Sequence, residues 1–446
     1  MKNSEIALEA PQLKRVLTRG DLIIYGLVIL TPTAPYPVYG TVQQVSGGHA
    51  ALCYLVAMVA MLFTAASYGK MSVAFPSAGS TYTYVQRGLN EHLGFLAGWA
   101  MMLDYFLIPL LSVVYASLTA ARWLPQVPYL VWALVFSLAI TLVNVQGIRM
   151  TARANVVLMA VMSVSTVLFA ALAIRWVVAA QGVAGLLSPA VLFDPGTFSL
   201  RPLMLGAGIA ALSYIGFDAV STLAEDSRSP ERDIAWATVA VCALQTILCV
   251  VTVYLAAIAW PDHRSFPQVE TAILDIGRRI GGAWMFGWIT FVLLVAGLAS
   301  ALTGQAGASR LLYGMGREGA ISRRFFGHLD AHSSTPTRSV WLMGAISLAG
   351  ALLARFQLIV ELLNFAFVGF ILVNLSVIGH YYYRRRSGRL WSHLLFPSLG
   401  ALVCAYLWLS LTGKAKLVGF GWMALGAIYL GVITRGFRVA PKRLEV

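Results

Sequence analysis

Long apolar runs with very few charges limit what this chain can fold into. Of its 446 residues, 59% are hydrophobic and only 11% are charged. Soluble domains carry about a quarter charged residues, and a water-soluble fold of this composition would expose large apolar patches and aggregate. The composition therefore excludes an ordinary soluble globular protein, a disordered chain and a nucleic-acid-binding module. We expect an integral membrane protein.

The apolar runs are long enough to cross a membrane repeatedly. A helix needs about 20 predominantly apolar residues to span the hydrocarbon core. Segments that meet this requirement lie near 21–45, 49–75, 93–121, 127–147, 153–179, 201–225, 233–259, 284–312, 337–354, 358–382, 394–411 and 415–435. The sequence thus predicts an all-α integral membrane fold with twelve transmembrane helices.

The positive charges predict the orientation. Cytoplasmic loops of membrane proteins carry an excess of Lys and Arg. Most of the 32 Lys and Arg residues fall in the tails and in the loops that share their side, including the cluster Arg384–Arg386. We predict that both termini lie in the cytoplasm. These clusters also account for the net charge of +14 without a nucleic-acid partner.

Neither the cysteines nor the histidines suggest a cofactor. The four cysteines lie inside apolar runs, where cysteine acts as a small buried hydrophobe, and the seven histidines form no metal motif. The sequence contains no nucleotide-binding loop of the Walker type. We expect no cofactor, no metal and no disulfide framework.

The first apolar segment contains three prolines within six positions, Pro32, Pro35 and Pro37. Each proline removes a backbone donor and clashes with the preceding helical turn. In lipid, the resulting irregular backbone is tolerated only where protein or a water-lined cavity satisfies the freed groups. This pattern predicts a broken helix at a binding site, with a proline-kinked structural helix as the alternative.

The sixth segment has a matching feature, because Gly216 and Phe217 are followed directly by Asp218. A carboxylate at membrane depth is costly unless it faces a cavity, a partner or a broken helix end. Interruptions five segments apart are expected if segments 1–5 and 6–10 form two inverted repeats. In such folds the substrate site lies at the midplane, where the broken helices meet.

Three motifs carry a resemblance to a known family. The segments Phe75–Tyr84, Gly216–Arg232 and Arg310–Gly319 resemble, in the same order, motifs of the amino acid–polyamine–organocation transporters. Within that family, Leu30–Pro32, Ser67–Lys70 and Leu103–Tyr105 are most similar to the bacterial putrescine importers.

The resemblance implies a five-plus-five inverted repeat with broken helices 1 and 6, a substrate site between helices 1, 3, 6, 8 and 10, and commonly proton coupling. It also implies a multi-pass protein of the bacterial cytoplasmic (inner) membrane. The corresponding parts of this chain are a tail at 1–20, helices 1–5 at 21–180, helices 6–10 at 201–385, helices 11 and 12 at 390–435, and a tail at 436–446.

The chain departs from the family in helix 1. The family's usual Gly-x-Gly, whose amides hold the substrate carboxylate, falls here on Pro35-Tyr36-Pro37, and proline has no N–H to donate. The putrescine importers carry an acidic residue where this chain has Pro37. The first departure counts against an α-amino acid substrate held by that route, and the second counts against a diamine.

Two acids are expected at membrane depth, Asp104 in the third segment and Asp218 in the sixth. A buried carboxylate must be paired, protonated or solvated, so each is a candidate for binding an ammonium group or carrying a proton. A structural hydrogen bond is the alternative for Asp104. Glu225, at the expected inner end of helix 6, is a candidate gate residue.

Aromatic and small polar residues at the two breaks complete the expected site. An ammonium group over an aromatic face gains about 0.5–2 kcal/mol, although most aromatics in membrane helices serve packing or anchoring. The candidate substrate-binding residues are Thr33, Pro35, Tyr36, Pro37, Tyr39, Asp104, Ser213, Tyr214, Gly216, Phe217 and Asp218.

We therefore predict a secondary active transporter that imports a small amine or amino acid by alternating access, with a putrescine-like polyamine favoured. The coupling ion is expected to be a proton. Sodium is the alternative, for which Ser300 and Thr303 offer hydroxyl groups that more commonly join membrane helices. A neutral amino acid permease or a solute antiporter remains open, and a membrane-embedded enzyme or a channel fits less well.

Overall fold

The computed structural model describes residues 17–75, 80–147, 152–223, 227–317, 321–330, 333, 335–436 and 438. Within these residues the chain is helical, with a single isolated bridge between Leu17 and Ser227 and no strand. Eight helical segments are long and apolar enough to cross a membrane. The fold is therefore that of a multi-pass membrane protein.

The described residues of the first half of the chain form both long and short helices. Its elements are α1 (Arg19–Leu30), α2 (Tyr39–Val45), α3 (Ala50–Ala74), α4 (Ser80–Gly88), α5 (Glu91–Trp123), α6 (Tyr129–Val145), α7 (Ala152–Gln181), η1 (Val183–Leu186) and α8 (Pro189–Leu192).

The second half has more interruptions. Its elements are α9 (Leu200–Ala210), η2 (Ala211–Tyr214), η3 (Phe217–Leu223), α10 (Pro230–Ala259), η4 (Val269–Thr271), α11 (Ala272–Arg317), α12 (Arg323–Phe326), α13 (Thr337–Leu353), α14 (Phe356–Leu363), α15 (Ala366–Val377), η5 (Ile378–Arg384), η6 (Trp391–Leu395), α16 (Phe396–Leu409) and α17 (Gly413–Ile433).

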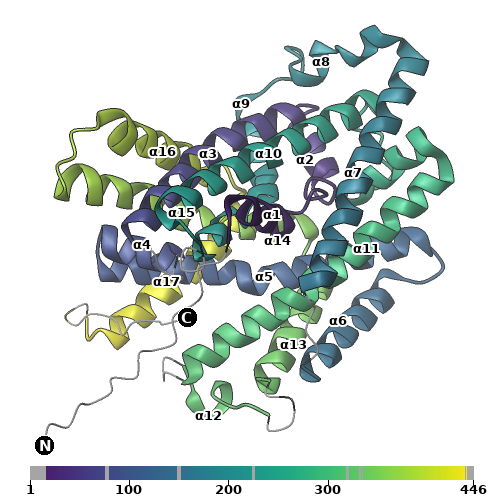
Figure 1. The fold of residues 1–446 in the computed structure, drawn as a ribbon. Coiled ribbons are helices and arrows are strands. Elements are labelled where there is room, and N and C mark those ends of the chain that lie inside the picture. The colour runs from purple at the N-terminus through teal and green to yellow at the C-terminus, as the bar shows by residue number, and fades with distance from the viewer. Residues whose placement is uncertain are drawn as a thin grey trace, which may run out of the picture.

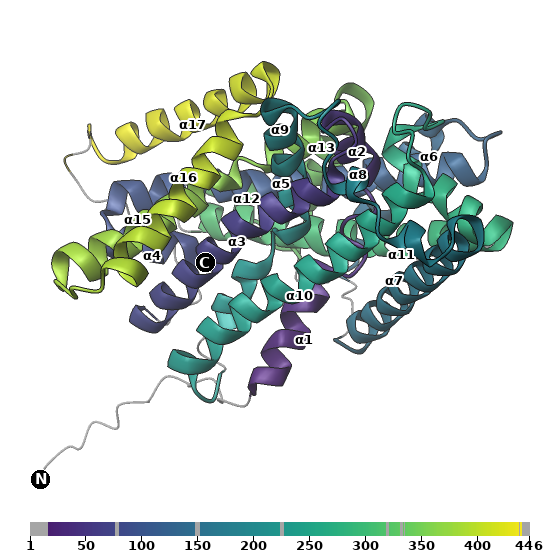
Figure 2. The ribbon, with the colours of Figure 1, turned by 90° about the horizontal axis from the view of Figure 1, so that it is seen from above.

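Two helix pairs dominate the packing. Helices α3 and α10 run side by side, as both Figure 1 and Figure 2 show, and α5 packs along α11. The first pair approaches closely because Gly69 has no side chain, since a Cβ there would lie 2.7 Å from the Cα of Ala235. Small residues commonly permit such contacts in membrane proteins, where packing replaces the hydrophobic effect between helices.

Burial separates central from peripheral segments. In the segment Phe356–Arg384, 72% of the most apolar stretch is buried, whereas the figure for α17 is only 17%. Helices α16 and α17 lie at one end of the bundle and α7 at the other (Figure 1). Exposed apolar side chains on peripheral helices, such as Val167 and Leu417, are suited to contact with lipid.

Two features of the helices were not predicted from the sequence. Helix α11 begins twelve residues before the predicted segment 284–312, and it bends at Gly282, whose φ of 70° suits a residue without a Cβ. The predicted segment 358–382 is divided, because α14 ends at Leu363 and α15 begins at Ala366. All four cysteines are buried, as expected of small hydrophobic residues in apolar helices.

Candidate functional site

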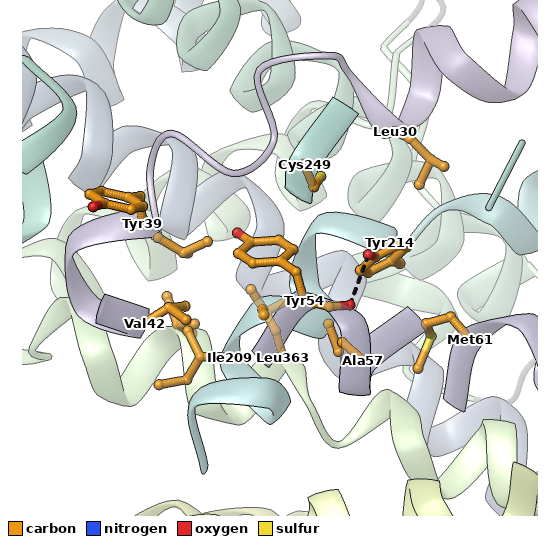
Figure 3. Close-up of a cluster of buried hydrophobic side chains, with 14 of the residues drawn as sticks. Leu30, Tyr39, Val42, Tyr54, Ala57, Met61, Ile209, Tyr214, Cys249 and Leu363 are labelled. Atoms are coloured by element: carbon orange, nitrogen blue, oxygen red, sulfur yellow. Dashed lines mark hydrogen bonds between the residues drawn. The ribbon is translucent and has the colours of Figure 1, made fainter. Parts of the chain in front are cut away.

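The first predicted break is present between α1 and α2. Helix α1 ends at Leu30, and the chain follows turns until α2 begins at Tyr39. Thr31 has a φ of 55°, a region that costs a non-glycine residue about 1–3 kcal/mol. Figure 3 shows this unwound stretch passing beside Tyr54 and Tyr214. The predicted site residues Thr33 and Pro35 are buried within it, and Pro37 is half-buried.

The second predicted break lies after α9 and η2. Ile215 is extended, and Gly216 has a φ of 117°, which only glycine adopts readily. The chain then continues as η3 from Phe217, so Asp218 lies in the first turn after the break. The backbone groups freed by this turn are the kind that a membrane protein tolerates only inside protein or beside a cavity.

Tyrosine hydroxyls join α3 to the second break. The hydroxyl oxygens of Tyr54 and Ser213 are 3.1 Å apart. The hydroxyl of Tyr214 donates to the carbonyl oxygen of Tyr54 at 3.2 Å, the bond drawn in Figure 3. Both tyrosines are fully buried. Ser213 and Tyr214 were predicted site residues, whereas Tyr54 was not, because a tyrosine in an apolar helix has no distinguishing pattern.

Asp104 has an unusual environment for a carboxylate. Its side chain is 4% exposed, and neither carboxyl oxygen has a hydrogen-bond partner among the described residues. A buried carboxylate that stays charged without partners is strongly unfavourable. Asp104 lies close enough to Asp218 for the two groups to interact electrostatically. The two predicted membrane-depth acids are therefore within electrostatic range of each other.

Asp218 is half-buried and lies among aromatic side chains. Tyr68, Tyr84 and Tyr105 are all within electrostatic range of its carboxylate. The side chain of Tyr105 is 50% exposed at the surface of the helix bundle. The ring of Phe217 lies 5.4 Å from that of Tyr68, which fixes the aromatic wall next to the acid.

The remaining predicted aromatic residues, Tyr36 and Tyr39, contact aromatic rings in other parts of the structure. The ring of Tyr36 lies 5.6 Å from Phe169 in α7, and the ring of Tyr39 lies 6.2 Å from Phe266 in the segment before α11. The hydroxyl groups of both tyrosines are buried without a hydrogen-bond partner among the residues that the structure describes. Glu225, the predicted gate residue, lies outside the described residues.

A polar cavity of about 440 Å³ adjoins α2. His49 lies in its wall and bridges two segments: its Nε2 accepts the N–H of Asp194 at 3.1 Å, and its Nδ1 lies 2.9 Å from the carbonyl oxygen of Ser46. Hydrogen bonds from the backbone N–H of Gly196 and from the side chain of Thr197 lower the pKa of Asp194 below its usual value. Gln43 of α2 is part of its lining, and none of the lining residues belongs to either break.

The polar residue that sequence reasoning missed is Gln245 in α10. It is fully buried, and its Nε2 donates to the carbonyl oxygens of Thr31 at 3.1 Å and Ser213 at 3.2 Å. One neutral side chain therefore contacts both breaks. A glutamine within an apolar span was the available signal, but the predicted binding site was limited to Asp104 and the residues at the two breaks.

Comparison with known proteins agrees with this architecture. A model of the amino acid permease family matches residues 37–427. The chain belongs to this family. The resemblance inferred from the motifs is therefore confirmed, and this permease is a transporter rather than an enzyme.

Individual relatives cover nearly the whole permease. The low-affinity putrescine importer PlaP of Escherichia coli (strain K12) is 31% identical over 435 residues, which are 96% of this chain and 95% of the relative. The branched-chain amino acid permease BcaP of Bacillus subtilis is 25% identical over 457 residues (95% and 94%). The methylthioribose transporter of the same organism is 25% identical over 454 residues (96% and 95%).

Proposed function

We propose that this permease imports a small organic amine, with a putrescine-like diamine favoured, and couples import to protons. The observation that carries the proposal is the carboxylate of Asp104, buried and without a hydrogen-bond partner among the described residues, beside Asp218. An ammonium group would supply the missing donors and the opposite charge. The likeness to a putrescine importer over 96% of the chain supports the same substrate class.

The surroundings of the two acids suit an amine. Tyr68 and Phe217 present aromatic rings close to Asp218, and a desolvated ammonium gains about 2 kcal/mol or more over such a face. Pro35 and Pro37 have no N–H with which to bind a carboxylate. The site therefore favours an amine over an α-amino acid.

Proton coupling follows from the same pair of acids. Two neighbouring carboxylates in a poorly solvated site do not both remain charged, so one of them binds a proton or a cation. Binding of an amine by one acid and of a proton by the other would neutralise the pair, and release of both on the cytoplasmic side would carry the proton inward with the amine. In this scheme Asp104 and Asp218 share the coupling, and Glu225 acts as a gate.

Alternating access is supported by bonds within two sets of helices. Tyr54 and Gln245 tie α3 and α10 to the breaks, while Gln305 of α11 donates to Thr141 of α6 at 3.0 Å. We propose that the first set rocks against the second. The full arrangement would be twelve helices with a five-plus-five inverted repeat, in the bacterial inner membrane, with both termini in the cytoplasm.

Uptake by purified protein in proteoliposomes tests the proposal. Labelled putrescine should accumulate when the outside is more acidic, and accumulation should collapse when the pH gradient is removed. Unlabelled putrescine should compete, whereas alanine and proline should not. Competition by neutral amino acids alone would show that the permease carries those solutes instead.

A further inference from the structure

The amide group of Gln245 lies where carbonyl oxygens from both broken helices converge. Its Nε2 is 3.1 Å from the carbonyl oxygen of Thr31, 3.2 Å from that of Ser213 and 3.5 Å from that of Leu30. Leu30 and Thr31 end α1, and Ser213 precedes the second break. The NH₂ group has two hydrogens, and the two shorter contacts use both of them.

The orientation of this amide is determined by its neighbours. If the side chain were flipped, Oε1 would face three carbonyl oxygens and could donate to none of them. In the observed orientation Oε1 is buried and accepts no hydrogen bond from the described residues. An unsatisfied buried acceptor is destabilising, so the contacts on the NH₂ side outweigh this cost.

Converging carbonyl oxygens attract positive charge. Carbonyl groups at the end of a helix carry the negative end of the helix dipole. In a site shielded from water, such carbonyls need either N–H donors or a cation, and unwound carbonyls in transporters can hold sodium. Here the donors are part of the protein, because Gln245 is fully buried in α10.

We infer that Gln245 is a positioning residue that joins the two helix breaks through a neutral N–H donor, in the place where a monovalent cation would otherwise be needed. Transport by this permease then requires no sodium ion. The inference rests on the proposed function, which it deepens by assigning the coupling to protons alone and by naming the side chain that makes sodium unnecessary.

The test uses the isosteric variant Gln245→Glu. Replacing the amide by a carboxylate removes both N–H donors and places a negative charge beside the three carbonyl oxygens. A small cation then becomes necessary to hold the two breaks together. Purified Gln245→Glu protein should be stabilised against heat by sodium chloride but not by choline chloride. The wild type should melt at the same temperature in both salts.

A matched control is available in Gln305, a second buried glutamine whose NH₂ group donates to Thr141 at 3.0 Å. Its Oε1 accepts from the side chain of Asn144 at 2.7 Å, and its Nε2 lies 3.4 Å from one carbonyl oxygen, that of Val340. A carboxylate there therefore keeps a donor and faces one carbonyl oxygen where Gln245 faces three. Gln305→Glu should therefore show no sodium-dependent stabilisation. Equal stabilisation of both variants by sodium would overturn the inference.

Uptake provides a second readout. Gln245→Leu removes both donors without adding charge, and loss of one hydrogen bond of about 1.4 kcal/mol corresponds to a tenfold change in affinity. We expect KM for putrescine to rise at least about tenfold, with kcat less affected and with no rescue by sodium. In Gln245→Glu, sodium should restore uptake. An unchanged KM in the folded Gln245→Leu variant, or a sodium requirement in the wild type, would contradict the assignment.

The two hypotheses fail in different experiments. If the wild type carries no putrescine under any gradient, the proposed substrate is wrong. Sodium-dependent melting of Gln245→Glu would still support the role of Gln245, and a sodium-independent melting temperature would reject that role whatever the substrate.

Discussion

Glu361 and Asp104 are two of the carboxylates buried in the helices of this permease, and they differ in how they are satisfied. Glu361 in α14 is 1% exposed and accepts three hydrogen bonds: from Gln357 at 2.9 Å, and from the backbone and hydroxyl of Thr412 at 3.0 and 2.6 Å. Asp104 in α5 is 4% exposed and accepts none from the described residues.

The difference separates a structural acid from a candidate transport acid. Thr412 is the N-cap of α17, so Glu361 places its charge beside the positive end of a helix and joins two segments far apart in the chain. Burial of a carboxylate is stabilised there by the protein itself. At Asp104 none of the described residues supplies a donor, and in our proposal a proton or a cationic substrate fills that place.

The largest expected effect is on uptake by Asp104→Asn and Asp218→Asn. Removing one partner of a buried ion pair costs about 3–5 kcal/mol, so labelled putrescine uptake should fall by about a hundredfold or more while expression and melting temperature are retained. Uptake in proteoliposomes, normalised to folded protein, measures this. Near-normal uptake by either variant would show that the substituted acid has a structural role and no role in transport.

Glu361→Gln should show the opposite behaviour. The amide keeps the side-chain shape but loses the charge at the α17 N-terminus and mismatches one of the three donors, which we expect to destabilise the protein by about 1–3 kcal/mol. The melting temperature in detergent should fall, while KM for the folded fraction stays unchanged. A rise in KM without loss of stability would remove the distinction between the two acids.

This contrast also shows what the sequence could reveal. Asp104 and the break after Leu30 were predictable, because a charge in an apolar segment and a run of prolines are local features with large costs. The ends of α5, at Glu91 and Trp123, likewise agree with the predicted segment 93–121. Local composition was sufficient for these features.

The features that depend on tertiary contacts were not predictable. Glu361 is bonded to Thr412, 51 residues away, and no pattern in either segment indicates the pair. Gln245 reaches Thr31, 214 residues away. Asn364, at the division between α14 and α15, is fully buried with no side-chain partner among the described residues, and nothing in the segment 358–382 predicted an interruption there.

The prolines of the first break are expected to influence substrate affinity. Pro35→Ala and Pro37→Ala restore backbone N–H groups that the unwound stretch now lacks. We expect KM for putrescine to change by about threefold to tenfold, the effect of roughly one hydrogen bond. The melting temperature should change little, because the turns of this stretch are held by other hydrogen bonds. One of them is the bond from the N–H of Ala34 to the carbonyl oxygen of Thr31. Loss of folded protein instead would indicate that the prolines serve as a structural kink.

The smallest expected effect is that of Gln357→Leu. Gln357 supplies one of the three donors to Glu361, and the two donors of Thr412 remain, so the stability loss should be about 0.5–1.5 kcal/mol. Uptake should be indistinguishable from wild type, because no group near Asp104 changes. Combining Gln357→Leu with Glu361→Gln should then cost less than the sum of the single changes, since both remove the same bond. Strict additivity, or a fall in uptake from Gln357→Leu alone, would show that the Glu361 region does more than hold α14 to α17.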